Sequence, residues 1–149
     1  MGKKIIAKNK RARFDYHLKE EFEAGIVLLG TEIKSLRLGK ASIVEAYIGI
    51  DKNHEIWAYN INIPQYEFGN IHNHDETRKR KLLLHEKEIN YIKHQMQAGG
   101  MTIVPTILYL KGSRAKLEIF LAKGKKLHDK RHDEAKKDAQ KKLRQGNYD

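Results

Sequence analysis

The feature that most constrains this chain is a strand-like alternation that runs directly into concentrated positive charge. Over residues 115–122 apolar side chains recur at every second position, which is the periodicity of a β-strand with one buried face. A basic segment, residues 123–131, follows at once. A body built of strands that carries a basic arm has few suitable partners, and the phosphate backbone of a nucleic acid is the first of them.

The overall charge favours the same class of partner. Of 149 residues, 30 are Lys or Arg and 19 are Asp or Glu, so the net charge is +11 at pH 7. A hydrophobic fraction of 40% allows a real core, and the length suits one domain with a tail. The charge imbalance predicts a polyanionic partner: RNA, DNA or an anionic membrane surface.

A membrane is the weakest of these partners. No apolar run approaches the ~20 residues that a spanning helix needs. Lys8 interrupts the first residues before the core of a signal peptide could form, and Ile6 occupies the position where a myristoylation signal requires Ser or Thr. Cysteine is absent, which excludes disulfides, thiolate metal ligands and a Cys nucleophile. We therefore expect a cytoplasmic protein without a membrane partner.

Alternation and turn signals predict several strands. From Phe14 to Glu23 the apolar side chains lie at even positions, beyond Gly25 both faces turn apolar, and Gly25 suggests a bulge or bend in this strand. Apolar residues also alternate over residues 44–63 and over residues 102–122, in each case on both sides of a polar turn. These two segments are expected to form hairpins.

Two short helices are expected between the strands. Thr31 can cap a helix that ends at Gly39, and residues 89–96 have helical spacing before a stop at Gly99 and Gly100. Five or six strands with two inserted helices fit a mainly β fold, specifically a six-stranded antiparallel barrel of the oligonucleotide-binding type.

The expected boundary between the body and a basic C-terminal tail falls at residues 126 and 127. Within residues 127–149, Ala and Leu recur every four residues amid mixed charge, which gives a helix too weakly amphipathic to dock on a core by itself. We expect residues 1–126 to form an RNA-binding body, and the tail to be disordered when free and helical when bound.

Four basic clusters strengthen the case for nucleic-acid binding. They lie at residues 8–13, 34–40, 78–81 and 123–131. Ordinary solvated surface explains most single charge runs. Four clusters on a barrel of high positive charge favour contact with phosphates.

Some aromatic residues near these clusters can stack on unpaired bases. Tyr66 and Phe68 belong to an expected loop and are the better candidates. Phe14 and Tyr16 share the apolar face of the first long strand, so core packing is the expected role for them.

The sequence gives little support for an enzyme or a metal site. His128 and His132 have i, i+4 spacing, but the Glu of a metalloprotease helix is missing and the neighbouring cations would repel a divalent ion. His72 and His74 could hold a metal or perform acid–base chemistry, although solvated loop histidines are commoner. We therefore expect no catalytic residue, no metal and no cofactor.

Five motifs occur in order along most of the chain. They are NKRAR at residues 9–13 followed by Tyr16, EFEAGI at 21–26, GTEIKSLR at 30–37, RKLLLH at 80–85 and AKGKKLHDKR at 122–131. Together they resemble the small protein B family, the SsrA-binding proteins, which are partners of transfer-messenger RNA. One match could be chance, whereas five in order are specific.

The resemblance implies a non-enzymatic, monomeric RNA-binding adaptor. Its barrel would hold the tRNA-like domain of transfer-messenger RNA, and with elongation factor Tu the complex would enter the vacant A site of a stalled bacterial ribosome. The body would replace the missing anticodon half of a tRNA. The tail would become helical in the empty mRNA channel of the ribosome, near the decoding centre. The outcome would be trans-translation, in which the ribosome is rescued and the peptide tagged.

The resemblance also implies two sets of site residues. The RNA-binding set is Asn9, Lys10, Arg11, Tyr16, Glu23, Thr31, Lys34, Arg37, Arg80, Lys81, Leu83 and His85. The ribosome-binding set is Lys123, Gly124, Lys125, Lys126, His128, Asp129, Lys130 and Arg131. Glu23 would accept hydrogen bonds from base amino groups while cations contact phosphates, and Gly124 would permit close approach or an unusual backbone turn.

Two other interpretations stay open at this point. A structural ribosomal protein would be equally basic and tailed, and it would remain on ribosomes in high salt. An RNA-processing enzyme would use His72 and His74, or His128 and His132, and its RNA cleavage would be lost on His→Ala substitution.

Overall fold

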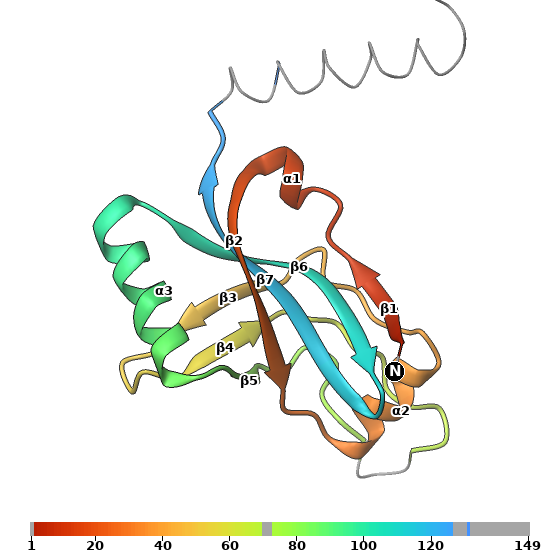
Figure 1. Cartoon of the computed structure of the whole chain (residues 1–149). Coiled ribbons are helices and arrows are strands. Elements are labelled where there is room, and N and C mark those ends of the chain that lie inside the picture. The colour runs from red at the N-terminus through yellow and green to blue at the C-terminus, as the bar shows by residue number, and fades with distance from the viewer. Residues whose placement is uncertain (1, 70–72, 127–130, 132–149) are drawn as a thin grey trace, which may run out of the picture.

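The computed structural model describes residues 2–69, 73–126 and 131. Within that part of the chain, seven strands form one antiparallel sheet in the order β1-β6-β7-β2-β5-β4-β3 (Figure 1). The strands are β1 (Lys3–Lys8), β2 (Tyr16–Ile26), β3 (Tyr47–Ile50), β4 (Ile56–Tyr59), β5 (Arg80–Leu83), β6 (Thr102–Lys111) and β7 (Arg114–Gly124). The helices are α1 (Ala12–Asp15), α2 (Gly30–Arg37) and α3 (Glu86–Gly99).

The predicted mainly β, antiparallel fold is confirmed, although the sheet has seven strands and not six. The edge strand β3 contacts β6 near the other end of the strand order, so the sheet curls on itself as a barrel does. The strands missing from the prediction are β1 and β5. β1 carries no regular alternation, and the inward position of β5 is occupied by Arg80, which hides its apolar face.

The core follows the periodicity of the strands. Leu117, Ile119 and Leu121 of β7 are buried, as the alternation predicts. Ile92 of α3 and Leu36 of α2 are both 0% exposed and close the core from outside the sheet. Each such side chain contributes about 1.5–3 kcal/mol by leaving water, so burial of these apolar faces fixes the curvature of the sheet.

The long strand β2 differs from its prediction in two details. Its register against β7 shifts between Leu18 and Glu20, so the bulge is not at Gly25. Gly25 instead pairs with Lys116 of β7 and Leu83 of β5, and a Cβ atom there would lie 3.3 Å from the Cβ atom of Leu83. The glycine therefore permits close approach of two neighbouring strands.

Helices α2 and α3 end close to the glycines that predict their C-termini, whereas the N-terminal cap of α2 differs from the predicted one. Gly39 and Gly100 adopt positive φ values of 77° and 64° after α2 and α3, as expected for C-terminal caps. Thr31 does not cap α2: the Leu29 amide donates to Glu32 Oε1 at 2.7 Å, and the capping carboxylate belongs to Glu32. Phe14, expected in a strand, lies in α1.

The predicted tail lies outside the described residues except for Arg131, so the boundary at residue 127 stays a prediction. In the part of the chain that the structure describes, no helix has the length and hydrophobicity that crossing a bilayer requires.

Candidate nucleic-acid interface

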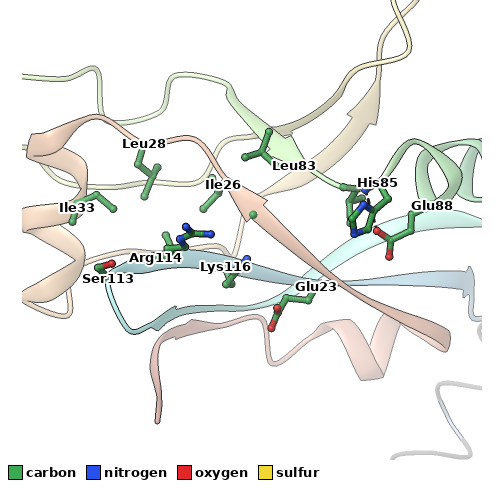
Figure 2. Close-up of a pocket in the computed structure, with 13 residues that line it drawn as sticks. Glu23, Ile26, Leu28, Ile33, Leu83, His85, Glu88, Ser113, Arg114 and Lys116 are labelled. Atoms are coloured by element: carbon green, nitrogen blue, oxygen red, sulfur yellow. Dashed lines mark hydrogen bonds between the residues drawn. The ribbon is translucent and has the colours of Figure 1, made fainter. Parts of the chain in front are cut away.

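An open groove of about 690 Å³ lies between β2, β5 and the start of β7 (Figure 2). Three residues of the predicted RNA-binding set line it: Glu23 from β2, Leu83 from β5 and His85, which precedes α3. They come from two motifs that lie far apart in the sequence. We call this cavity the β2–β5 groove.

Backbone alternation aims these groups at the groove. Leu82 is 1% exposed and faces the core, so its neighbour Leu83 faces outward and is 53% exposed. His85 is exposed at the N-cap of α3, where its amide donates to Glu88 Oε1 at 3.1 Å. An apolar side chain and an imidazole therefore stand side by side at one rim.

Glu23 is held as an anion. The Tyr109 hydroxyl donates a hydrogen bond to its carboxylate, and Lys111 Nζ lies 3.7 Å from Glu23 Oε2. The hydrogen bond from Tyr109, helped by Lys111, holds the pKa of Glu23 below its ordinary value. The carboxylate is also 41% exposed, so it can still accept hydrogen bonds from a ligand.

Two cations of this groove were missed by the sequence analysis. Arg114 and Lys116 line it from the start of β7. The signal was present, because alternation places Lys116 on the face of β7 opposite Leu117, and Leu117 is buried. The groove thus combines two carboxylates, Glu23 and Glu88, with two cations and an apolar lining that includes Ile26 and Ile33.

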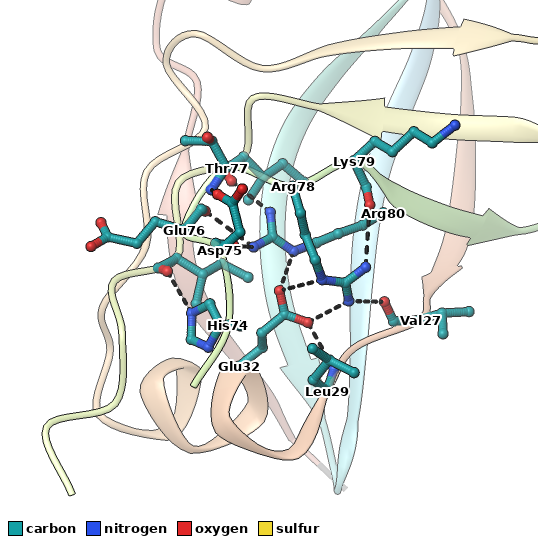
Figure 3. A network of polar contacts seen from close by, with 12 residues as sticks. Val27, Leu29, Glu32, His74, Asp75, Glu76, Thr77, Arg78, Lys79 and Arg80 are labelled. Carbon is teal, nitrogen blue, oxygen red and sulfur yellow. Dashed lines mark hydrogen bonds and ion pairs between the residues drawn. The ribbon is translucent and has the colours of Figure 1, made fainter. Parts of the chain in front are cut away.

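Arg80 is not part of any RNA-accessible surface, and the prediction that it contacts RNA is wrong. Its side chain is 0% exposed, and Nε lies 2.6 Å from Glu32 Oε2 (Figure 3). Its Nη1 donates to the Ile61 carbonyl at 2.6 Å and its Nη2 to the Glu76 carbonyl at 3.1 Å. A buried guanidinium needs such partners because leaving it unpaired would be very costly.

Glu32 binds two arginines at once. Arg78 Nη2 lies 2.5 Å from Glu32 Oε1, and Arg78 Nε donates at 3.1 Å to Oε2, the oxygen that Arg80 also binds. Burial alone would raise the pKa of Glu32, but hydrogen bonds from Arg78, the Leu29 amide and Arg80 outweigh it and hold the pKa below its ordinary value. The network ties the N-terminus of α2 to β5, which carries Leu83 into the groove.

Two of the three residues of α2 that are predicted to contact RNA are exposed to solvent. Lys34 and Arg37 are exposed. The hydroxyl of Thr31, however, lies 2.8 Å from His74 Nδ1, and His74 Nε2 lies 2.7 Å from the Ile63 carbonyl. A carbonyl only accepts, so Nε2 donates to it and Nδ1 can accept from Thr31. These contacts give the buried His74 a structural role, while its proposed catalytic partner His72 lies outside the described residues.

A second groove, of about 460 Å³, gathers three more predicted residues: Asn9, Arg11 and Tyr16. Asn9 Nδ2 donates to the Pro105 carbonyl at 3.2 Å, and the Arg11 guanidinium lies 5.3 Å from the centre of the Phe14 ring. The cavity is lined by residues of both α1 and β3, and we call it the α1–β3 groove.

The remaining members of the RNA-binding set are lysines. Lys10 is exposed, and Lys81 is half-buried with Nζ 2.7 Å from Glu55 Oε2. The predicted stacking ring Phe68 is 78% exposed and makes an edge contact with Tyr66 at 5.6 Å. Lys34 Nζ lies 5.5 Å from the Tyr66 ring centre, so this aromatic pair adjoins α2.

The predicted ribosome-binding set begins within the sheet. Lys123 and Gly124 close β7, where they pair with His17 and Tyr16. Gly124 is not among the positive-φ glycines, so of the two alternatives predicted for it, close approach or an unusual backbone turn, the turn is not formed. No atom lies within 4 Å of a Cβ atom built at Gly124, which leaves room for close approach.

The set continues along α1. The Lys125 amide donates to the Asp15 carbonyl at 2.9 Å and Lys125 Nζ to the Arg13 carbonyl at 2.8 Å. Lys126 and Arg131 are exposed. His128, Asp129 and Lys130 lie outside the described residues.

A curled antiparallel sheet that displays two grooves, exposed rings and clustered cations defines a nucleic-acid-binding protein of the small-barrel class. Comparison with known proteins then gives the family. The model of the family described as SmpB protein matches residues 6–147, and the chain belongs to this family, as the resemblance predicts.

Its relatives are similar over most of their length. The SsrA-binding proteins of Lachnoclostridium phytofermentans and Thermobifida fusca are 56% and 49% identical, over 92% and 95% of this chain and 88% of each relative. One chain of a solved structure described as "tmRNA-SmpB: a journey to the center of the bacterial ribosome" is 41% identical, with a TM-score of 0.65. That match covers 80% of this chain and 84% of the other.

Proposed function

We propose that this chain is a non-enzymatic adaptor that binds the tRNA-like domain of transfer-messenger RNA and delivers it to stalled ribosomes for trans-translation. The relatives are SsrA-binding proteins, and the similar solved structure is described by tmRNA, SmpB and the bacterial ribosome. The observation that carries the proposal is the meeting of Glu23, Leu83 and His85 in one groove. The resemblance implies these residues one by one, and the fold brings the three to one cavity.

The β2–β5 groove has the chemistry for a folded RNA. Arg114 and Lys116 provide charge for phosphates, which positions the RNA without reading its sequence. Ionised Glu23 accepts hydrogen bonds from base amino groups and repels phosphates. Such a carboxylate restricts the groove to RNA segments that present a base edge at that point.

The proposed contact with the ribosome lies at the other end of β7. Arg114 lines the groove at the start of the strand, and Gly124 ends it. At about 3.3 Å per residue, the 11-residue strand separates the two by about 30 Å. One rigid strand would thus hold transfer-messenger RNA at one end and direct the basic segment into the decoding centre at the other.

The remaining parts of the proposal follow from this role. The protein would act as a monomer in the cytoplasm, and the loaded complex would enter the ribosome with elongation factor Tu. Sedimentation of the purified protein with and without its RNA measures whether the protein is a monomer and how many copies bind one RNA.

Competitive gel shifts with transfer-messenger RNA, ordinary tRNA and an unrelated structured RNA test the proposal. We expect a clear preference for transfer-messenger RNA, and Glu23→Ala should weaken that complex roughly 10- to 100-fold, since a hydrogen bond to a charged group contributes about 1.5–3 kcal/mol. Glu21→Ala is the matched control, because Glu21 lies on the same strand and is exposed but does not line the groove. Equal affinity for all three RNAs would overturn the proposal.

A further inference from the structure

The outward face of β3, β4 and β5 carries an organised set of aromatic and basic side chains. Along these strands Ile48, Ile56, Ala58 and Leu82 are buried in the core, so the alternate residues point away from it. We call the outward set, with Lys79 just before β5, the aromatic face. It consists of Tyr47, Gly49, Trp57, Tyr59, Lys79 and Lys81.

Strand register arranges this face in two rows. Tyr47 pairs with Tyr59, and Ala58 pairs with Arg80, so the same register continued by one residue places Lys79 beside Tyr59. Two positions along, Gly49 pairs with Trp57, and Trp57 pairs with Lys81. Each row therefore leads from the edge strand β3 to a lysine on or just before β5.

The rings of the first row are stacked and flat. The Tyr47 and Tyr59 ring centres lie 4.9 Å apart with planes inclined by 14°. Gly49 makes this possible, because a Cβ atom there would lie 3.2 Å from Tyr59 Cε2. The Tyr59 ring thus lies close to the β3 backbone at Gly49, and Tyr47, stacked on it, is 54% exposed.

Trp57 of the second row is held by a hydrogen bond, and the ammonium group of Lys79 from the first row lies over its ring. Trp57 Nε1 donates to Asp51 Oδ2 at 2.9 Å, which holds the indole in place. Lys79 Nζ lies 4.4 Å from the Trp57 ring centre, within cation–π distance. Lys81 Nζ lies 2.7 Å from Glu55 Oε2, so Lys79 is the better placed of the two lysines to contact a phosphate.

The aromatic face connects the two grooves. Leu83, two residues beyond Lys81 on β5, lines the β2–β5 groove, and Tyr47 on β3 lines the α1–β3 groove. An RNA strand that leaves the first groove can therefore cross β5, β4 and β3 without losing contact with the protein. This continuity with two grooves lined by predicted RNA-binding residues favours RNA over a protein as the occupant.

We infer that the aromatic face binds an unpaired nucleotide of the RNA held in the β2–β5 groove: its base stacks on Tyr47, and Lys79 contacts an adjacent phosphate. The inference rests on the proposed function and extends its RNA surface. Preorganised rings bordered by cations are the usual platform for unpaired bases, because every base has a π-face and every nucleotide a phosphate.

Trp57 is the single tryptophan of the sequence and lies within this face. Its fluorescence therefore reports on the face in the unmodified, full-length protein. Saturation with transfer-messenger RNA should quench the emission and reduce the access of acrylamide to the indole. Tyr47→Ala should weaken RNA binding roughly tenfold, and Lys79→Ala should lower the salt dependence of binding by about one phosphate contact.

Tyr91→Ala is the control, since Tyr91 is 41% exposed on α3 and lies outside the face. It should bind RNA like the unchanged protein. Circular dichroism of each variant verifies the fold, and Tyr47→Phe, which keeps the ring, should restore binding.

Gel shifts on the same samples separate the two proposals. If transfer-messenger RNA is not preferred in the gel shift, the proposed function fails. If it is preferred and bound, but acrylamide access to Trp57 is unchanged and Tyr47→Ala binds as tightly as Tyr91→Ala, this inference alone is overturned.

Discussion

At the scale of single residues, opposite surroundings give two glutamates different roles. Glu23 lies at the surface with one hydrogen bond from Tyr109, so its carboxylate keeps accepting capacity for a ligand. Glu32 is 0% exposed and its oxygens are occupied by Arg78, Arg80 and the Leu29 amide. Residue type alone does not separate a binding carboxylate from a structural one.

Replacing Glu32 should destabilise the fold. Glu32→Gln leaves the Arg80 guanidinium buried without a counter-charge, and breaking a buried pair in this way costs about 3–5 kcal/mol. Urea unfolding measures the loss. Arg78→Ala, which removes the more exposed partner at 29% exposure, should cost clearly less. Equal effects of the two substitutions would contradict the account of the network.

The same network predicts how stability depends on pH. Because the pKa of Glu32 is lower in the folded protein than its ordinary value of 4.5, its contribution is fully present above that value. The contribution falls as the pH drops from 4.5 through the lower folded-state pKa. In Glu32→Gln the free energy of unfolding should therefore fall less steeply as the pH drops below 4.5. An unchanged pH dependence in this range would contradict the prediction.

At the scale of elements, we expect β7 to belong to the RNA-binding body and the segment after it to contact the ribosome. Lys123 and Gly124 pair with β2 within the sheet, whereas the predicted tail lies beyond it. Deletion of residues 127–149 should therefore preserve the preference for transfer-messenger RNA, because both grooves are formed by earlier residues.

The same deletion should abolish peptide tagging on ribosomes stalled on an mRNA without a stop codon, measured with purified components. A deletion from residue 132, which retains the basic segment, is the matched comparison and should keep more activity. Normal tagging by the protein that ends at residue 126 would refute the division between body and tail.

Elements also show where the sequence pattern failed. β7 was predicted because its apolar side chains alternate without interruption. β5 was missed because the inward position that an apolar residue would mark carries Arg80. The sequence shows that Arg80 is a cation, but only the fold brings Glu32 from α2, 48 positions away, to bury it.

At the scale of the whole molecule, the net charge of +11 should make RNA binding strongly dependent on salt. Each phosphate contact releases counterions and contributes about −0.7 to −0.9 to the slope of log K against log salt concentration. Titrations from low to physiological salt measure the slope. Lys116→Ala should make this slope shallower by the contribution of about one phosphate contact. Lys19→Ala should leave the slope unchanged, because Lys19 is exposed but lies outside both grooves and outside the four basic clusters. A flat response would contradict a phosphate-dominated surface.

The sequence by itself determined the mainly β body, the glycine stops of α2 and α3, the excess of positive charge and the membership of the family. These properties follow from local periodicity, from backbone freedom at glycine and from motifs that are contiguous in the chain. The tertiary structure alone decided that Glu23, Leu83 and His85 share a groove with Lys116, that Arg80 is buried, and that Tyr47, Tyr59 and Trp57 form one face. Those facts depend on strand register and on contacts between distant segments, which local patterns do not contain.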